Sequence, residues 1–137
     1  MSFVLDCSVA ITWCFADEAT PQGDALLERL KQGGAIVPTL WHLEIGNVLV
    51  RAERRGRVTA AILQAQLALL RKLPITIDDQ TTARALTETL TLARNHQLTT
   101  YDAAYLELAM RQSKPLATND RQLQQAAAHV GVQVLTA

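Results

Sequence analysis

The segment FVLDCSVAITW, residues 3–13, decides the fold class, because a short apolar run is followed at once by a carboxylate and then by a stretch of helical character. The run FVLD has the length of a strand, and we expect a helix over roughly 8–16. Asp6 therefore marks the carboxyl end of a strand that we expect to be central in a sheet.

The same order of strand and helix recurs along the chain. The further strand-length runs are AIVP (35–38), ITID (75–78), LAT (116–118) and VQVL (132–135). Helical patterns occupy roughly 21–32, 39–56, 59–72, 81–96, 100–112 and 120–129. This alternation predicts an α/β fold with a central parallel sheet of four to five strands, covered by helices on both faces. In such sheets ligands bind outside the carboxyl ends of the strands.

Length and composition indicate one domain spanning residues 1–137. Apolar residues make up 49% of the chain, ample for a buried core. The 13 basic and 13 acidic residues cancel, so any nucleic-acid-binding surface has to be a local patch. No apolar run approaches the roughly 20 residues of a membrane span, and the N-terminus lacks the basic start of a signal peptide. We expect a soluble cytoplasmic protein in which Cys7 and Cys14 are free.

Two carboxylates, Asp6 and Asp120, lie just beyond expected strands. Asp120 follows PLATN and precedes RQLQQAAAHV, so it also suits the N-cap of a helix. Asp6 is explained less well as a cap, because Ser8 is able to fill that role alone. Each residue fits either a helix cap or a ligand at the carboxyl edge of the sheet.

A third carboxylate, Glu44, interrupts an apolar helix face. It lies in PTLWHLEIGNVL (38–49), on a stripe of apolar residues at helical spacing. Burying a glutamate is costly unless it is paired or binds a metal. The alternatives are solvent exposure at the edge of the stripe or an ion pair with Arg51.

The fourth carboxylate, Asp102, is in the segment YDAAYLELA (101–109), which otherwise looks made to be buried. Thr99 and Asp102 resemble a capping box, and an acidic residue in the first turn suits the helix dipole. Asp102 nevertheless shares the apolar side of the helix with Tyr105 and Leu106. The roles of cap and ligand are compatible here.

One site explains all four carboxylates together, whereas separate caps and ion pairs require four coincidences. Clustered carboxylates repel one another unless a cation neutralises them. Oxygen ligands without His or Cys select a hard ion, Mg²⁺ or Mn²⁺. Such an ion suits phosphoryl chemistry, because it activates water and stabilises charge on the phosphate. Asp78 and Asp79 also follow an expected strand and are competing candidates.

The motifs that carry these residues resemble those of the PIN domain, and within it the VapC-type toxins of bacterial toxin–antitoxin pairs. The motifs are VLDCSVAITW (4–13), LEIGNVL (43–49), TTYDAAYLELA (99–109) and LATND (116–120). The resemblance implies a PIN-like three-layer α/β/α fold. It also implies an endoribonuclease that depends on Mg²⁺ or Mn²⁺ and cuts single-stranded or looped RNA, and a cognate antitoxin protein that blocks its site.

The resemblance further implies roles for particular residues. Matched by position, the catalytic and metal-binding set is Asp6, Glu44, Asp102 and Asp120. Polar positions near the site are Ser8, Asn47, Thr118 and Asn119. Many relatives carry a basic or aromatic residue in place of Asn119, which leaves the substrate preference open.

An RNA substrate requires positive charge opposite its phosphates. The candidate is RAERRGR (51–57), with Arg51, Arg54, Arg55 and Arg57, on the helix that carries Glu44. The alternative is that these charges only suit the C-terminal end of that helix. Tyr101 is a candidate for stacking on a base, whereas Trp13 and Trp41 are expected to pack inside the protein or between subunits.

The helix AAILQAQLALLRKL (60–73) is very apolar for a surface helix. It fits a homodimer surface, a groove for the antitoxin, or a core helix. A homodimer is the expected assembly.

Two other functions fit parts of the pattern. A receiver-like phospho-acceptor signalling domain would use Asp6 with Asp78 or Asp79, and also Thr118, but it leaves Glu44 and Asp102 without a role. A catalytically silent PIN-like binding module would keep the fold without hydrolysing RNA.

Overall fold

A five-stranded parallel sheet lies at the centre of the computed structural model, which describes residues 2–137. The strands lie in the order β3-β2-β1-β4-β5, and every pairing is parallel. Their bounds are β1 (Phe3–Leu5), β2 (Ala35–Val37), β3 (Ile75–Ile77), β4 (Leu116–Ala117) and β5 (Val134–Leu135). The predicted parallel sheet of four to five strands is confirmed, and β1 is its central strand.

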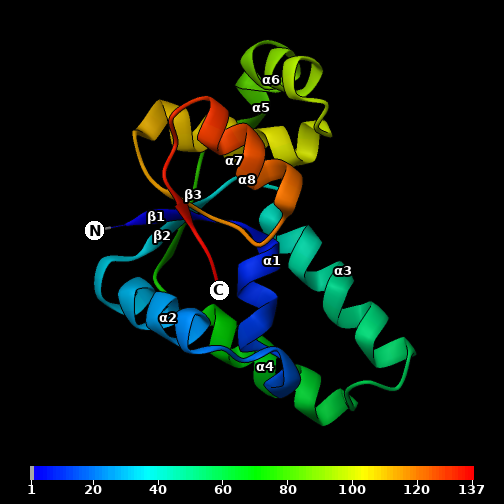
Figure 1. Cartoon of the computed structure of the whole chain (residues 1–137). Helices are drawn as coiled ribbons and strands as arrows, with labels where there is room; N and C mark the ends of the chain where they lie inside the picture. Colours follow the sequence, from blue (N-terminus) through cyan, green and yellow to red (C-terminus); the bar gives the residue numbers. More distant parts are fainter. Residues whose placement is uncertain (1) are drawn as a thin grey trace.

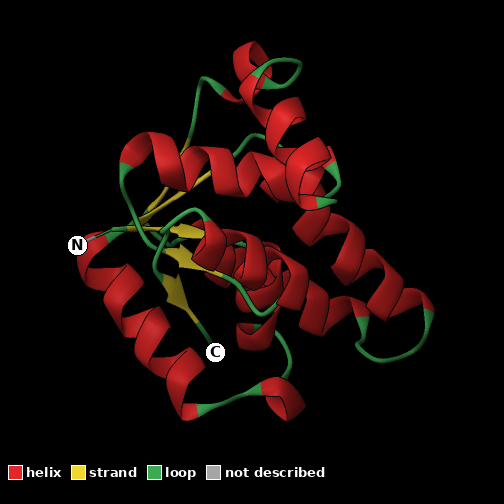
Figure 2. Cartoon of the chain, turned by 45° about the horizontal axis from the view of Figure 1, so that its top comes forward, coloured by secondary structure: helices red, strands yellow, loops and turns green. Residues whose placement is uncertain are grey.

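Helices connect the strands and cover both faces of the sheet. Their bounds are α1 (Cys7–Ala10), η1 (Ile11–Trp13), η2 (Ala16–Glu18), α2 (Pro21–Gly33), α3 (Trp41–Arg54), α4 (Ala60–Arg71), α5 (Thr81–Arg84), α6 (Glu88–His96), α7 (Thr100–Gln112) and α8 (Arg121–His129). Helices α7 and α8 lie on one side of the sheet, and α2 and α4 on the other (Figure 1). The strands are enclosed between these helices (Figure 2), which is the expected three-layer α/β/α arrangement.

The direction of winding changes at β1, because β2 and β3 follow on one side of it and β4 and β5 on the other. The carboxyl ends of β1 and β4 therefore lie side by side at the switch point, where open α/β sheets bind ligands. Leu5 is paired with Ala117. The two strands consequently end at nearly the same level, and the residues after them emerge together.

Helix α7 is the most deeply buried helix, with every residue of Ala103–Ala109 buried. It contacts both β1 and β4, and Phe3, Val4 and Leu5 of β1 are fully buried. A helix enclosed on most sides is apolar around most of its circumference, which explains the sequence of α7. Asp102, one residue before the buried run, is thereby held at the border of the core.

Two expected helices are interrupted in the structure. The segment expected over 8–16 consists of the short α1 and two 3₁₀ turns, and the Thr12 hydroxyl donates to the Val9 carbonyl at 2.6 Å. The segment 81–96 is divided into α5 and α6, where the Thr87 hydroxyl donates to the Arg84 carbonyl at 3.3 Å. Local hydrogen bonds from threonine compete with the helical pattern, and apolar spacing alone does not reveal them.

Helix α4 is not a core helix, so that interpretation of residues 60–73 is wrong. Leu63 is its only buried residue, whereas the side chains of Ile62 and Leu69 are 49% and 65% exposed. Leu67 and Leu70 pack against the core while partly buried, and the apolar side chains that remain on the surface are those of Ile62 and Leu69.

Several smaller expectations are confirmed. Cys7 and Cys14 are free and buried. Trp41 is buried, and Trp13 is packed with its indole N–H donating to the Gly23 carbonyl at 2.9 Å. Within residues 2–137, none of the helices has the length and apolar character needed to cross a membrane.

Candidate acidic site at the sheet edge

Asp6 and Asp120 lie at the ends of the two strands that meet at the switch point. Asp6 follows β1, and its backbone N–H donates to the Ala117 carbonyl of β4 at 2.9 Å. Asp120 follows β4 and is the N-cap of α8, because its Oδ1 accepts from the Leu123 N–H at 2.9 Å. The cap role anticipated for Asp120 is present, and it leaves the second carboxylate oxygen outside the cap.

Glu44 and Asp102 project from the first turns of two helices, α3 and α7. Thr99 caps α7 by accepting from the Asp102 N–H at 3.1 Å, so half of the expected capping box is formed. Within residues 2–137, no hydrogen bond to the Asp102 carboxylate and no ion pair between Glu44 and Arg51 is found. Neither carboxylate has a cationic partner that would account for its position.

The four carboxylates lie close enough together for their charges to interact. Burial raises the pKa of Asp102 to about 6, with further contributions from the charges of Asp120 and Asp6. Burial also raises the pKa of Glu44, and Asp6 and Asp102 add to the rise. Among the described residues, no cationic side chain contributes to these shifts. The site is thus a concentration of uncompensated negative charge.

Two hydroxyl groups hold the Asp6 carboxylate. Ser8 Oγ donates to Asp6 Oδ2 at 2.6 Å, and Thr118 Oγ1 donates to the same oxygen at 2.8 Å. Backbone N–H groups fix the two hydroxyls in turn, that of Asn119 on Ser8 and that of Asp120 on Thr118. Burial raises the pKa of Asp6, and these two hydroxyl groups only partly offset the rise.

A third hydroxyl, that of Tyr105, donates to Glu44 Oε1. The tyrosine side chain is fully buried in α7. Burial and the neighbouring Glu44 charge raise the pKa of Tyr105, so the phenol remains a hydrogen-bond donor. The sequence reveals Tyr105 only as a marker of the apolar face of α7. Its position three residues after Asp102, on the same side of the helix, is the signal that relates it to the site.

The two asparagines expected near the site differ in their contacts. Asn119 Oδ1 accepts from the backbone N–H of Ala137 at 2.9 Å, which ties the residue to the end of the chain. Asn47 is exposed on α3, one turn beyond Glu44. Asn119 directly precedes Asp120, and Asn47 follows Glu44 by three residues with its side chain exposed to solvent.

The donor set suits a hard divalent cation, although the side chains do not form a ready-made metal site. Carboxylate and hydroxyl oxygens favour Mg²⁺ or Mn²⁺ over softer ions. Within the described part of the chain, no group of three or more His, Cys, Asp or Glu side chains is arranged to hold a metal ion. A closer approach of the carboxylates would increase their repulsion, and a cation relieves that repulsion.

A sequence model of the PIN domain matches residues 3–129. The chain belongs to the PIN domain family. A comparison with curated protein sequences finds no match.

Solved structures share the fold of this PIN domain over nearly its whole length. PAE2754 from Pyrobaculum aerophilum matches with a TM-score of 0.71 and 23% identity, covering 98% of this chain and 84% of that chain. VapBC2 from Rickettsia felis, solved with a DNA fragment from its promoter, matches with a TM-score of 0.69 and 14% identity, covering 100% of this chain and 99% of that chain. FitAcB from Neisseria gonorrhoeae matches with a TM-score of 0.68 and 17% identity, covering 98% of this chain and 96% of that chain. At these identities the likeness concerns the fold.

The four arginines of the basic segment 51–57 of this PIN domain differ in their contacts. Arg51, Arg54 and Arg55 are exposed on the last turns of α3 and just after it. Arg57 instead pairs with Asp17 at 3.0 Å and Glu18 at 2.7 Å. Its guanidinium also lies over the ring of Phe15, 3.8 Å from the ring centre. The positive charge of Arg57 is thus already matched, whereas in the described part of the chain the other three arginines form no ion pair.

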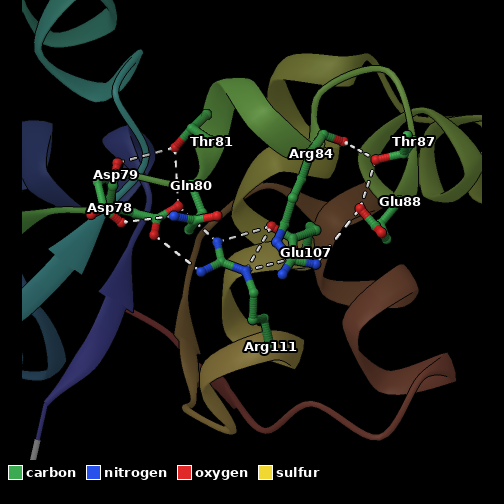
Figure 3. A network of polar contacts seen from close by, with 9 residues as sticks. All are labelled: Asp78, Asp79, Gln80, Thr81, Arg84, Thr87, Glu88, Glu107 and Arg111. Atoms are coloured by element: carbon green, nitrogen blue, oxygen red, sulfur yellow. Dashed lines mark hydrogen bonds and ion pairs between the residues drawn. The ribbon is translucent and has the colours of Figure 1, made fainter.

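The competing carboxylate Asp78 belongs to a separate ionic network, shown in Figure 3. Arg111 donates to both Asp78 oxygens, at 3.1 and 2.7 Å, and its Nε donates to Glu107 at 2.9 Å. Burial acts to raise the pKa of Asp78, but the hydrogen bonds from Arg111 prevail and lower it. Because β2 separates β3 from β1, Asp78 and Asp6 also leave non-adjacent strands. A receiver-like acceptor site has no support from this arrangement.

Proposed function

We propose that this PIN domain is a divalent-cation-dependent endoribonuclease and acts in the cytoplasm as the toxin of a toxin–antitoxin pair. The observation that carries the proposal is the group of carboxylates at the switch point, which interact electrostatically and have no cationic partner among residues 2–137. Uncompensated charge of this kind costs stability, and clusters of perturbed acids at a sheet edge mark functional sites. The PIN family generally comprises nucleases, which agrees with this chemistry.

In the proposed site Asp6 and Asp102 would hold the principal Mg²⁺ or Mn²⁺, and Glu44 and Asp120 would complete the ligand set. Such an ion, when bound, lowers the pKa of a coordinated water and stabilises charge on the phosphate. The protein's part is to fix the carboxylates, and Ser8 and Thr118 do this for Asp6. Asn47 and Asn119 are proposed as polar neighbours of the scissile phosphate.

The proposed RNA-binding surface is the exposed end of α3. Arg51, Arg54 and Arg55 lie on or just after the helix whose first turn carries Glu44, so phosphates bound there lead along α3 towards the acidic site. Arg57 is left out of this surface, because Asp17 and Glu18 already neutralise it. Tyr101 is 64% exposed, next to Asp102, and is proposed to stack on a base near the site.

The partners are proposed from the VapC-type motifs together with the fold. VapBC2 and FitAcB share the fold over almost the whole chain, which supports a cognate antitoxin that covers the acidic site. The exposed apolar side chains of α4, Ile62 and Leu69, offer surface for a protein partner. A homodimer is the proposed assembly of the toxin itself.

A cleavage assay on a mixed pool of RNA tests the proposed function. The purified protein, stripped of metal with a chelator, should cut RNA only after Mg²⁺ or Mn²⁺ is added. Asp6→Asn should reduce cutting to background while circular dichroism shows a folded protein, since the amide still accepts hydrogen bonds from Ser8 and Thr118. Folded wild-type protein that cuts no RNA with either ion would instead support the silent binding module.

A further inference from the structure

Tyr105 brings a buried hydroxyl to the acidic site from within the core. Its ring is fully buried in α7, one turn beyond Asp102, and its hydroxyl donates to Glu44 Oε1 across 61 positions of sequence. Helix α7 therefore contributes twice to the site: Asp102 is one of its carboxylates, and Tyr105 contacts another, that of Glu44.

The position of the Tyr105 hydroxyl is fixed by packing. The phenol is rigid beyond two rotatable bonds, and the enclosed ring leaves it no room to turn. Glu44, in contrast, has a long flexible side chain on a partly exposed turn of α3. The rigid group therefore determines where the flexible one lies.

A neutral donor differs from a cationic one in its effect on a carboxylate. Arg111 orients Asp78 and also cancels its charge, so nothing remains to attract a metal ion. The hydroxyl of Tyr105 orients Glu44 Oε1 and leaves the negative charge in place. Ser8 and Thr118 act in the same way on one oxygen of Asp6. Hydroxyl donors thus arrange the acidic site without neutralising it.

We propose that Tyr105 is a positioning residue of the acidic site, which holds one oxygen of Glu44 so that the other is presented to the divalent cation. The inference rests on the proposed function only in assigning the cation to this site. Neighbouring groups that orient a metal-binding side chain typically change metal affinity or activity by 10- to 100-fold when removed.

The test compares Tyr105→Phe with Thr91→Val. Both variants lose one hydroxyl group, but Thr91 is exposed on α6, a helix that carries none of the four carboxylates, and its hydroxyl donates to the Thr87 carbonyl at 3.1 Å. Mn²⁺ binding is followed by electron paramagnetic resonance, which requires no catalysis. Tyr105→Phe should weaken Mn²⁺ binding by about 10-fold or more, and Thr91→Val should leave it unchanged.

Cleavage gives a second readout that a purely structural role would not move. Tyr105→Phe should lower kcat at limiting Mn²⁺ and recover activity as Mn²⁺ is raised, with KM for RNA unchanged. In a Glu44→Gln background, the tyrosine substitution should add no further loss of Mn²⁺ affinity. Wild-type affinity and Mn²⁺ dependence in folded Tyr105→Phe would overturn the proposal.

If Tyr105→Phe does not fold, Glu44→Asp tests the same hydrogen bond by changing its acceptor instead of its donor. Shortening the side chain withdraws the carboxylate from the hydroxyl and should lower Mn²⁺ affinity similarly, whereas wild-type affinity in this variant would overturn the positioning role. If wild-type protein binds Mn²⁺ but cuts no RNA, the ribonuclease proposal fails and the Mn²⁺ titrations still decide the role of Tyr105. If the wild type does not bind Mn²⁺, both proposals fail.

Discussion

Two groups of carboxylates on this PIN domain show how the same residue type takes opposite roles. In the Arg111 network, Asp78 and Glu107 are buried against one guanidinium. At the acidic site, Asp6, Glu44, Asp102 and Asp120 have hydroxyl or backbone donors or no hydrogen bond at all among the described residues. The pKa of Asp78 is lowered, whereas those of Asp6 and Asp102 are raised.

The partner, and not the degree of burial, therefore distinguishes the neutralised acids of the Arg111 network from the acids of the proposed site. Asp78 is as buried as Asp6, with 4% and 5% of their surfaces exposed. A bidentate guanidinium satisfies the charge of Asp78 and joins the end of β3 to α7. The acidic site retains its charge, and the protein is left with a cost in stability that a divalent cation would remove.

The largest expected effect comes from breaking the network. Arg111→Ala leaves Asp78 and Glu107 buried without a counter-charge and should lower the free energy of unfolding by roughly 3–5 kcal/mol. Chemical denaturation measures the change. Arg84→Ala is the control, because within residues 2–137 the one ion pair of the Arg84 side chain is a long 3.7 Å contact with the exposed Glu88, and its loss should cost about 0.5 kcal/mol or less. Similar losses in both variants would remove the distinction.

Adding Mn²⁺ should stabilise the protein through the acidic site. At a concentration 100 times the dissociation constant, binding to the folded state adds about 2.7 kcal/mol to the free energy of unfolding. A thermal melt with and without Mn²⁺ measures the effect, and Asp6→Asn should abolish most of it. An equal gain in Asp6→Asn would place the ion elsewhere.

Removing one charge from the acidic site should stabilise the metal-free protein. Asp6→Asn relieves burial of a carboxylate and its repulsion by Asp120, for a gain on the order of 1 kcal/mol. Denaturation in the presence of a chelator tests this. A clear loss of stability would mean that the Asp6 charge is a structural requirement, as that of Asp78 is.

The two groups should respond to pH in opposite directions. The pKa of Asp102 is about 6 when folded and 3.8 otherwise, so the folded state binds this proton more tightly, and the penalty at neutral pH decreases progressively as the pH falls from about 6 towards 3.8. The lowered pKa of Asp78 means that its stabilisation is complete above the unfolded value and is lost as the pH falls through the folded one. Unfolding without metal should therefore become harder from about pH 7 to about pH 4 and easier at more acidic pH.

Asp102→Asn isolates the first of these responses. The gain in stability between about pH 7 and about pH 4 should shrink in this variant, while the loss at lower pH should persist. Identical pH curves for wild type and Asp102→Asn would show that Asp102 does not titrate in this range.

The smallest expected effect concerns the exposed arginines of α3 and the residue after it. Within residues 2–137 they form no ion pair with an acidic side chain, just as the acidic site has no cationic partner. Replacing Arg54 and Arg55 by Ala should weaken RNA binding and reduce the slope of its salt dependence by about one unit for each phosphate that is no longer neutralised. Arg94→Ala is the control, because Arg94 is an exposed arginine on α6, outside the proposed RNA-binding surface. Binding titrations at several salt concentrations measure both, and an unchanged slope would remove this surface from RNA recognition.

Much of the fold is readable from the sequence because it depends on local periodicity. The five apolar runs are all strands, and Thr99 and Asp120 cap the helices that they precede. The breaks within segments 8–16 and 81–96 are not predicted by apolar spacing, because threonine hydroxyl groups there donate to backbone carbonyls and compete with the helical pattern.

Local sequence patterns predict the order of strands and helices and single out the four carboxylates beside them, because burial patterns and strand ends follow from neighbouring residues. Which acids are neutralised depends instead on contacts between distant elements. Asp78 meets Arg111 across 33 positions, and Glu44 meets Tyr105 across 61. Such pairings depend on how helices pack against the sheet. Periodicity along the chain does not identify which residue of a distant helix or strand will be the contact partner.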